Sequence, residues 1–317
     1  MGNSFIQEIA LLAGLNDNKS LKKRSNVDYF RDPASVHNLF TNIFENSPNT
    51  PGAYPETIRP VIEKAEGIRE GHLLDHYIDI IRRYHQKNIH IIRVAEEAYP
   101  SQLAKIPDPP FIIYVKGRIE CLSKPAVAVV GTREISPEGA MKVLDIVDLF
   151  VQLGYTIVSG LARGTDTCAH EAALNFGGET IAVLPGDIEN IVPGTNRELA
   201  GRISRSGALI SEVTSLTKMH RGRYIERNRI TSALSRAVIV IETRRSGGSI
   251  RQAETAFRQG VPVYAVRPED TDERVAAGFE SLISMGATPI NAVEDLSVYF
   301  GGTQGPGARI TTLADFL

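Results

Sequence analysis

The chain is poor in cysteine, in long apolar runs and in excess charge of either sign. Its two cysteines, Cys121 and Cys168, match no metal-ligand spacing, so we expect reduced thiols in a cytoplasmic protein, with a single disulfide as the alternative. No apolar run approaches the roughly 20 residues of a membrane helix. The first residues lack a secretory apolar region, and Ile6 breaks the myristoylation pattern. Cytoplasmic localisation without membrane contact is the prediction.

The charge balance limits the possible partners. The net charge is -2 and the pI is about 6.4, so no overall field attracts nucleic acid or an anionic membrane. Any polyanion must then be held by a local basic patch. With 317 residues, 42% of them hydrophobic, the chain can bury a substantial core, and its length favours about two domains.

The N-terminal part differs in texture from the rest. The first fifty residues are polar and predict short helices and loops, and residues 71–86 repeat apolar side chains at helical spacing. His72 and His76 lie four residues apart on this helix, but no third metal ligand is near, so no metal site is predicted. Short strands are expected at 88–92 and 111–115. We place a helical, partner-docking region at residues 1–120 and a second domain at residues 121–317.

The second domain carries six short apolar runs, most of them followed by a helical pattern. They lie at residues 126–130, 156–158, 180–184, 208–210, 237–241 and 262–266. Continuous β-branched runs alternating with amphipathic helices predict an α/β fold with a parallel sheet covered on both faces. In such folds ligands bind beyond the carboxyl ends of the strands.

The loops after the first two of these strands are rich in glycine and arginine. Gly131 and Arg133 follow the first strand, and Gly160, Arg163 and Gly164 follow the second. Glycine lets the backbone approach a phosphate, and arginine supplies a charged fork. An ordinary strand-to-helix turn is the competing interpretation.

The best-known catalytic and nucleotide-binding signatures are missing. The chain has no GxGxxG, no P-loop and no nucleophile elbow, so we predict no cofactor and no catalytic relay. Asp166 is expected to cap the next helix, with His170 facing it one turn on.

Positive charge is concentrated between Ser215 and Arg251. This segment holds nine basic side chains, eight of them arginine, against Glu226 and Glu242. A solvated charged face is the ordinary interpretation of such a run. The preference for arginine favours phosphate contact, because its planar fork binds phosphate bidentately and stacks on bases.

In this order the motifs GTR, SGLARGTDTCAHEAAL, TIAVLPGDIE, LISE, RNRITSALS, SGGSIRQA and VPVYAV resemble those of the DprA/Smf (DNA-processing protein A) family. The resemblance covers roughly residues 89–290. It implies an extended Rossmann-like, doubly wound, mostly parallel sheet. It also implies single-stranded DNA binding, a homodimer and a RecA-type recombinase as partner. The nucleic-acid or phosphate-binding residues that it implies are Gly131, Arg133, Gly160, Arg163, Gly164, Asn196, Arg227, Asn228, Arg229, Gly248 and Ser249.

The chain departs from the family pattern at both ends. Val266-Arg267-Pro268 stands where the family has valine-proline-glycine, no winged helix follows, and the first eighty residues do not resemble the usual N-terminal module. From the arginine-rich segment and the ordered motifs, the leading hypothesis is a non-enzymatic single-stranded DNA-binding protein that acts in DNA processing or recombination.

Two alternatives stay open. One is a DprA-like antitoxin or sensor in anti-phage defence, controlling a toxin partner; Tyr77 and Tyr84 of the 71–86 helix would supply a docking surface, unless they pack against the chain's own core. The other is a nucleotide N-glycosidic-bond hydrolase, because residues 246–254 faintly resemble a PGGxGTxxE signature ending in Glu254.

Overall fold

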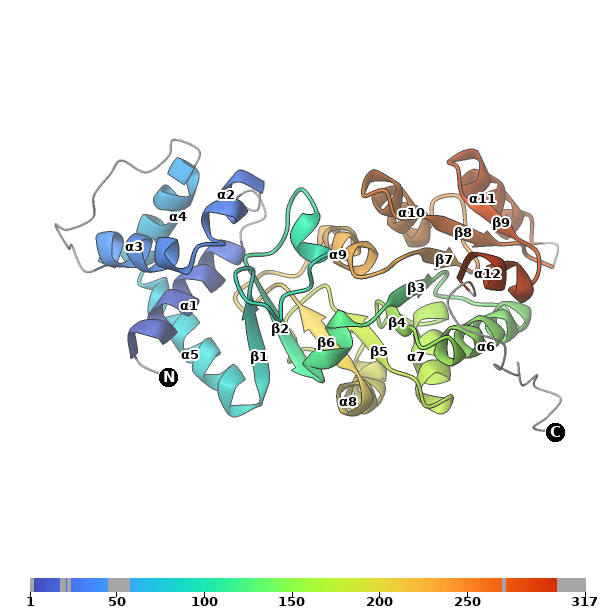
Figure 1. Cartoon of the computed structure of the whole chain (residues 1–317), viewed down its shortest axis with the longest axis horizontal. Helices are drawn as coiled ribbons and strands as arrows, with labels where there is room; N and C mark the ends of the chain where they lie inside the picture. The colour runs from blue at the N-terminus through green and yellow to red at the C-terminus, as the bar shows by residue number, and fades with distance from the viewer. Residues whose placement is uncertain (1–2, 18–20, 22–23, 45–57, 270–271, 301–317) are drawn as a thin grey trace.

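The structure, a computed structural model, describes residues 3–17, 21, 24–44, 58–269 and 272–300. Helices α1 (Asn3–Asn16), α2 (Arg24–Tyr29), α3 (Pro33–Phe44), α4 (Arg59–Glu70) and α5 (Leu73–Gln86) come first in the chain (Figure 1). The helical patterns predicted for the N-terminal part are thus confirmed within the described residues. Each helix in the described ranges is too short or too polar to cross a bilayer.

A sheet of nine strands runs through the rest of the described chain. Its strands lie in the order β1-β2-β6-β5-β4-β3-β7-β8-β9. The six predicted runs form β3 (Ala126–Val130), β4 (Thr156–Ser159), β5 (Thr180–Val183), β6 (Ala208–Ser211), β7 (Val238–Val240) and β8 (Val263–Val266). These pair in parallel, which confirms the mostly parallel, doubly wound class. The edge strand β9 (Thr288–Ile290) was not predicted, because it is short and contains Pro289.

The two strands before residue 121 belong to the same sheet. Strand β1 (Ile89–Arg93) pairs antiparallel with β2 (Ile112–Gly117), and β2 pairs antiparallel with β6. The domain boundary between residues 120 and 121 remains a prediction, but hydrogen-bonded pairing of the sheet continues across it.

Helices cover both faces of the sheet. Val127 and Val129 of β3 face a core with α6 (Pro137–Gln152) and α7 (Thr165–Asn175), whereas Ala128 and Val130 face a core with α9 (Arg221–Ala233) and α10 (Gly248–Arg258). Side chains alternate along a strand, so a strand buried on both sides must be apolar throughout. The remaining α-helices of the described residues are α8 (Arg197–Ser206), α11 (Glu273–Ser284) and α12 (Val293–Phe300), and short 3-10 helices lie at Leu103–Lys105, Ile119–Ser123 and Gly194–Asn196.

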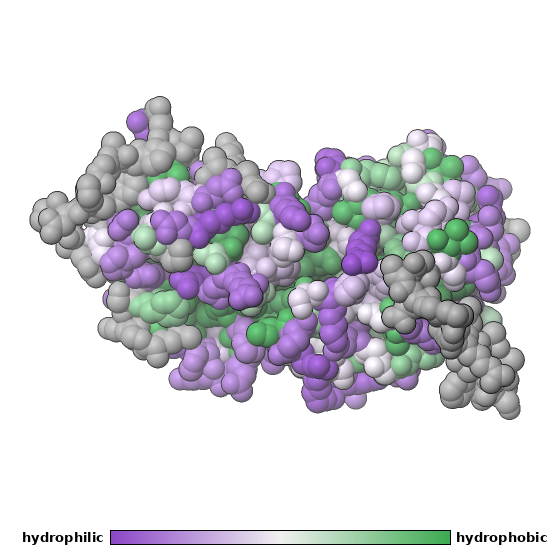
Figure 2. Space-filling view, in the orientation of Figure 1, coloured by the Kyte–Doolittle hydropathy of each residue, from purple (hydrophilic) through white to green (hydrophobic). Residues whose placement is uncertain are grey.

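Exposed apolar side chains are spread over several elements. The face in Figure 2 is largely hydrophilic, with hydrophobic residues in small groups. Large exposed side chains include Met141 on α6, Ile225 on α9 and Val298 on α12.

The helix predicted at residues 71–86 packs against its own chain. Tyr77 is 6% exposed and its hydroxyl donates to Asp17, while Tyr84 is 0% exposed and its hydroxyl donates to Asp187. The structure therefore supports packing of Tyr77 and Tyr84 against the chain's own core. These two tyrosines present no docking surface.

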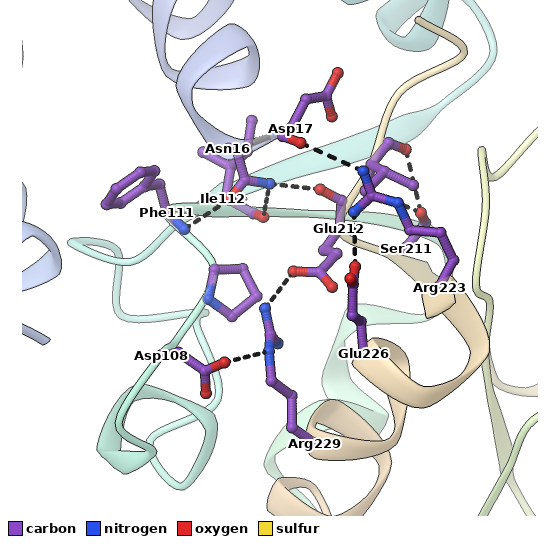
Figure 3. Close-up of polar contacts among 12 residues, drawn as sticks. Asn16, Asp17, Asp108, Phe111, Ile112, Ser211, Glu212, Arg223, Glu226 and Arg229 are labelled. Atoms are coloured by element: carbon purple, nitrogen blue, oxygen red, sulfur yellow. Dashed lines mark hydrogen bonds and ion pairs between the residues drawn. The ribbon is translucent and has the colours of Figure 1, made fainter. Parts of the chain in front are cut away.

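A buried asparagine joins the N-terminal helices to the sheet. Asn16, the last residue of α1, donates from Nδ2 to the carbonyl oxygens of Ile112 and Glu212 and accepts from the Phe111 N–H at 2.8 Å (Figure 3). Its side chain is 0% exposed. A buried amide that meets three backbone groups satisfies donors and acceptors that water cannot reach.

We expect Asn16→Ala to lower the free energy of unfolding by about 2–4 kcal/mol, because it leaves three buried backbone groups unpaired. Urea denaturation measures this change. The exposed Asn190 provides the control, since Asn190→Ala is expected to change the free energy by less than about 0.5 kcal/mol. Equal effects of the two substitutions would contradict the bridging role of Asn16.

Candidate nucleic-acid interface

A pocket of about 450 Å³ lies at the carboxyl ends of β3, β4 and β7. The loops after these strands and the helices α9 and α10 form its walls. It gathers six of the residues predicted from the sequence: Gly131, Arg133, Arg227, Asn228, Gly248 and Ser249. This is the edge of a parallel sheet where ligands are expected to bind.

Arg227 is a buried cation that faces this pocket. Its side chain donates from Nη1 to the Thr231 hydroxyl at 3.3 Å and from Nη2 to the Gly160 carbonyl at 3.5 Å, while Nε is buried without a hydrogen-bond partner. Among the described residues no carboxylate lies within ion-pair distance of it. Burial lowers the pKa of Arg227, and Asp166 opposes that shift. A buried cation of this kind is stabilised by an anion from outside.

Two glycines make room for this arrangement. A Cβ on Gly160 would lie 2.1 Å from Nη1 of Arg227, and Gly164, at φ +73°, would place a Cβ 2.4 Å from the Thr132 carbonyl oxygen. Neither residue lines the pocket. These glycines allow close packing behind the pocket wall, a role different from the phosphate contact predicted for them.

Asp166 and His170 do not form the predicted pair. Asp166 accepts from the Ala162 N–H at 3.2 Å, and burial raises its pKa although Arg227 lowers it. His170 instead contacts the Thr180 hydroxyl through Nδ1 at 2.7 Å. Burial, and then Arg227, lowers the pKa of His170 to about 3, so the ring is neutral. The expected contact between His170 and Asp166 was therefore wrong, because the ring points to the neighbouring strand β5.

The N-terminus of α10 forms another wall of the pocket. Gly247 is its N-cap and no side chain caps the helix. The first turn, Gly248 and Ser249, lines the pocket, with the Ser249 hydroxyl donating to Thr243 Oγ1 at 2.6 Å. Free N–H groups and the positive end of a helix dipole favour an anion here. Together with Arg227 they make two independent anion-binding features of one pocket.

The rim offers an aromatic ring. The Arg133 guanidinium lies 5.5 Å from the ring centroid of Tyr224, and Ile225 next to it is 51% exposed. Tyr224 was not among the predicted site residues. It lies three positions before Arg227, so helical spacing alone could have placed both on one face.

Arg229 lies on the other side of α9. It forms ion pairs with Glu212 at 2.5 Å and Asp108 at 3.1 Å, and it is 6% exposed (Figure 3). Burial lowers the pKa of Arg229, but Glu212 and Asp108 raise it by more, so the net shift is upward. Its guanidinium is already neutralised and does not line the pocket.

The other predicted residues also lie outside the pocket. Asn196 donates to the Leu161 carbonyl at 3.0 Å and to the Thr167 hydroxyl at 2.8 Å, and so braces the loop after β4. Arg163 is exposed on that loop. Residues of the lining that were not predicted are Val130, Thr132, Glu134, Ala162, Asp166, Tyr224, Ile225, Thr243, Arg244, Gly247 and Gln252.

Exposed cations follow one another along this edge of the sheet. In strand order they are Lys218 and Arg221 after β6, Arg163 after β4, Arg133 after β3 and Arg245 after β7. Carboxylates at the same edge are engaged as well. Glu212 pairs with Arg229, Glu189 with Arg83 and Lys87, and Glu134 with Arg244. Glu242, Asp166 and Asp187 accept hydrogen bonds from the Ser136 N–H, the Ala162 N–H and the Tyr84 hydroxyl. The edge is therefore locally basic although the chain is not.

The family model described as DNA recombination-mediator protein A matches residues 90–301. The DNA processing protein DprA of Bacillus subtilis is 35% identical over 218 residues, 68% of this chain and 73% of that protein. Protein Smf of Synechocystis is 35% identical over 225 residues, 70% of this chain and 56% of that protein.

Two solved structures are also similar. The X-ray structure of DprA from Streptococcus pneumoniae has a TM-score of 0.67 and 27% identity, covering 87% of this chain and 98% of its own. DprA from Helicobacter pylori, whose structure addresses its single-stranded DNA binding mode, has a TM-score of 0.60 and 27% identity, covering 67% and 96%.

The two buried arginines of α9 are expected to differ in their contribution to stability. Arg229→Met leaves Glu212 and Asp108 without their cation and should lower the free energy of unfolding by about 3–5 kcal/mol. Arg227→Met removes a buried cation that has no carboxylate within ion-pair distance, Asp166 acting on it only from farther away, and should change the free energy of unfolding by less than about 1 kcal/mol. Urea denaturation of both variants checks this, and similar losses would contradict the assignment.

Proposed function

Because the chain belongs to the DNA recombination-mediator protein A family, we propose that it binds single-stranded DNA along the carboxyl edge of its sheet, without catalysing a reaction. The observation that carries the proposal is Arg227, a buried guanidinium that faces a pocket and lacks a carboxylate partner among the described residues. A DNA phosphate supplies the direct ion pair that the more distant carboxylate of Asp166 does not make.

The pocket suits one nucleotide of the strand. Its phosphate binds between Arg227 and the N-terminus of α10, where Gly248 and Ser249 offer backbone N–H groups. A base stacks at the rim on Tyr224 or on the guanidinium plane of Arg133. Stacking accepts any base, so we expect little sequence preference. Gly131 and Asn228 complete the contact surface that we propose.

The rest of the strand follows the basic edge. Parallel strands end side by side, so the exposed cations after β6, β4, β3 and β7 lie in sequence along it. Of the residues predicted from the sequence, Arg163 belongs to this path. Gly160, Gly164, Asn196 and Arg229 support the site from behind. The single-stranded DNA binding mode described for the Helicobacter pylori relative supports the ligand class.

The hydrolase alternative depends on Glu254, and its surroundings do not favour that role. Glu254 is paired with Arg251 at 3.3 Å on the exposed side of α10 and does not line the pocket. Asp166 does line it, but its carboxylate accepts from the Ala162 N–H and holds the loop after β4.

Of the two biological roles, we propose DNA processing in recombination, because the matching family carries that description. A second copy of the chain and a RecA-type recombinase are the partners that this role implies. A toxin partner belongs to the defence alternative and would bind in addition to DNA.

We expect Arg227→Met to weaken single-stranded DNA binding at least about tenfold, since the phosphate loses a desolvated charge-assisted contact. Fluorescence anisotropy with a labelled strand measures the dissociation constant. Arg236→Met is the control, because Arg236 is an exposed arginine that precedes β7 at the opposite edge of the sheet. Unchanged binding in Arg227→Met would overturn the proposal.

Salt dependence gives a second test. Each phosphate contact on a single strand contributes about 0.7 to the slope of log affinity against log salt concentration. Arg133→Ala should therefore reduce the slope by about 0.7 and weaken binding several-fold at low salt, while Arg236→Ala leaves the slope unchanged. Equal slopes in the wild type and both variants would show that Arg133 contacts no phosphate.

A further inference from the structure

The last turn of α5 lies against the carboxyl edge of the sheet. Arg83 donates from Nε to Glu189 at 2.7 Å, and Lys87 donates from Nζ to the other oxygen of Glu189 at 2.5 Å. Glu189 belongs to the loop after β5. Arg83 also reaches the Ser215 hydroxyl at 3.3 Å in the loop after β6. Two loops of the basic edge therefore meet a helix of the N-terminal region.

Both cations of this cluster reach solvent. Arg83 and Lys87 are 40% and 55% exposed, while Glu189 between them is 17% exposed. Two cations share the carboxylate of Glu189, while Asp187 in the same loop accepts from the Tyr84 hydroxyl. Arg83 and Lys87 therefore each keep donor groups for another acceptor. Burial raises the pKa of Glu189, but hydrogen bonds from Lys87 and Arg83 lower it by more. The net shift is downward, so the carboxylate is ionised at neutral pH.

Arg83 and Lys87 lie along the path that we propose for the DNA strand. In the sheet, β5 lies two places from β3, whose loop carries Arg133 of the pocket rim. At about 4.8 Å between neighbouring strands this is about 10 Å, before the added reach of the side chains. A single DNA strand that runs from the pocket toward β6 therefore passes Arg83 and Lys87 within a few nucleotides.

We propose that Arg83 and Lys87 form a second phosphate-binding site for single-stranded DNA, so that the N-terminal region is part of the nucleic-acid interface. The inference depends on the proposed DNA binding at the pocket. Both residues precede the residues 90–301 that the family model matches, so the two cations of the site lie in the N-terminal region. Glu189 holds the two side chains at the edge of the path and competes with phosphate for them.

The experiment compares two ligands on the full chain. Phosphorylated dithymidylate fills the pocket only, whereas an oligothymidylate of about fifteen nucleotides, near the upper site size of single-strand-binding folds, reaches the cluster. Arg83→Ala/Lys87→Ala should bind the dinucleotide like the wild type. It should bind the long strand roughly fivefold to twentyfold more weakly, with a salt slope smaller by about 1.4.

The chain offers a matched control at the opposite edge. Arg118 and Lys124 flank Glu179 at 3.1 and 2.9 Å, the same arrangement of two cations around one carboxylate, just before β5. Arg118→Ala/Lys124→Ala removes the same charge and should leave binding of both ligands unchanged. An equal loss in this control would reduce the effect to overall charge and overturn the inference.

Glu189→Gln distinguishes phosphate binding by Arg83 and Lys87 from a purely structural contact between α5 and the loop after β5. If the cluster only fastened α5 to the loop, this substitution would weaken binding of the long strand. We expect tighter binding and a steeper salt slope, because the competing carboxylate is gone. Loss of long-strand binding in Glu189→Gln, or its persistence at wild-type strength in Arg83→Ala/Lys87→Ala, would overturn the second site.

The two proposals fail in different ways. If the wild type binds neither ligand, or if Arg227→Met binds both like the wild type, DNA binding at the pocket is wrong, and the second site with it. If Arg227→Met weakens both ligands while Arg83→Ala/Lys87→Ala weakens neither, only the second site is wrong. Thermal unfolding of each variant shows whether it is folded at the temperature of the titration.

Discussion

The arrangement of the site depends on one charge, the guanidinium of Arg227, held inside the protein with no carboxylate partner among the described residues. Removing a cation from water is expensive unless a negative group compensates for it. Here the fold provides hydrogen bonds to a hydroxyl and a carbonyl oxygen at 3.3 and 3.5 Å, and the carboxylate of Asp166 opposes the lowering of the Arg227 pKa only from beyond ion-pair distance. The guanidinium of Arg227 faces a pocket, where an anionic ligand can pair with it. The packing of α9 thus places a binding group at the pocket.

The two faces of α9 solve different problems. Arg227 faces the pocket, and Arg229, two residues on, faces Glu212 and Asp108. Residues two apart on a helix do not share a face, so one arginine binds outward while the other anchors the helix. The anchor also connects to the N-terminal helices, because the Glu212 carbonyl accepts from Asn16. The helix that presents the binding residue is thus fixed from behind by a buried polar network.

Much of the fold could be predicted from the chain, because buried parallel strands are apolar throughout and their helices are amphipathic. The joining of β1 and β2 to the sheet could not, since it depends on the pairing of Tyr114 with Ser211, far along the chain. For the site, motif positions identified which residues matter but not how. Arg227 and Arg229 carried the same expectation from sequence, and only the burial of Glu212 and Asp108 beside Arg229 separates them. Gly160 was likewise identified, but its neighbour in space is a side chain of the same protein.

The close approach of Gly160 and Arg227 has an evolutionary consequence. A Cβ at position 160 would lie 2.1 Å from Nη1 of Arg227, so a larger residue at 160 would displace the guanidinium from its place beside the pocket. Among descendants of this sequence, an alanine or serine at 160 should be accompanied by a shorter side chain at 227 or by an arginine that has moved out of this position. A homologue with these changes would have lost the buried charge beside the pocket. The residues at positions 160 and 227 in a sequence alignment would therefore indicate whether a homologue has kept the anion-binding pocket.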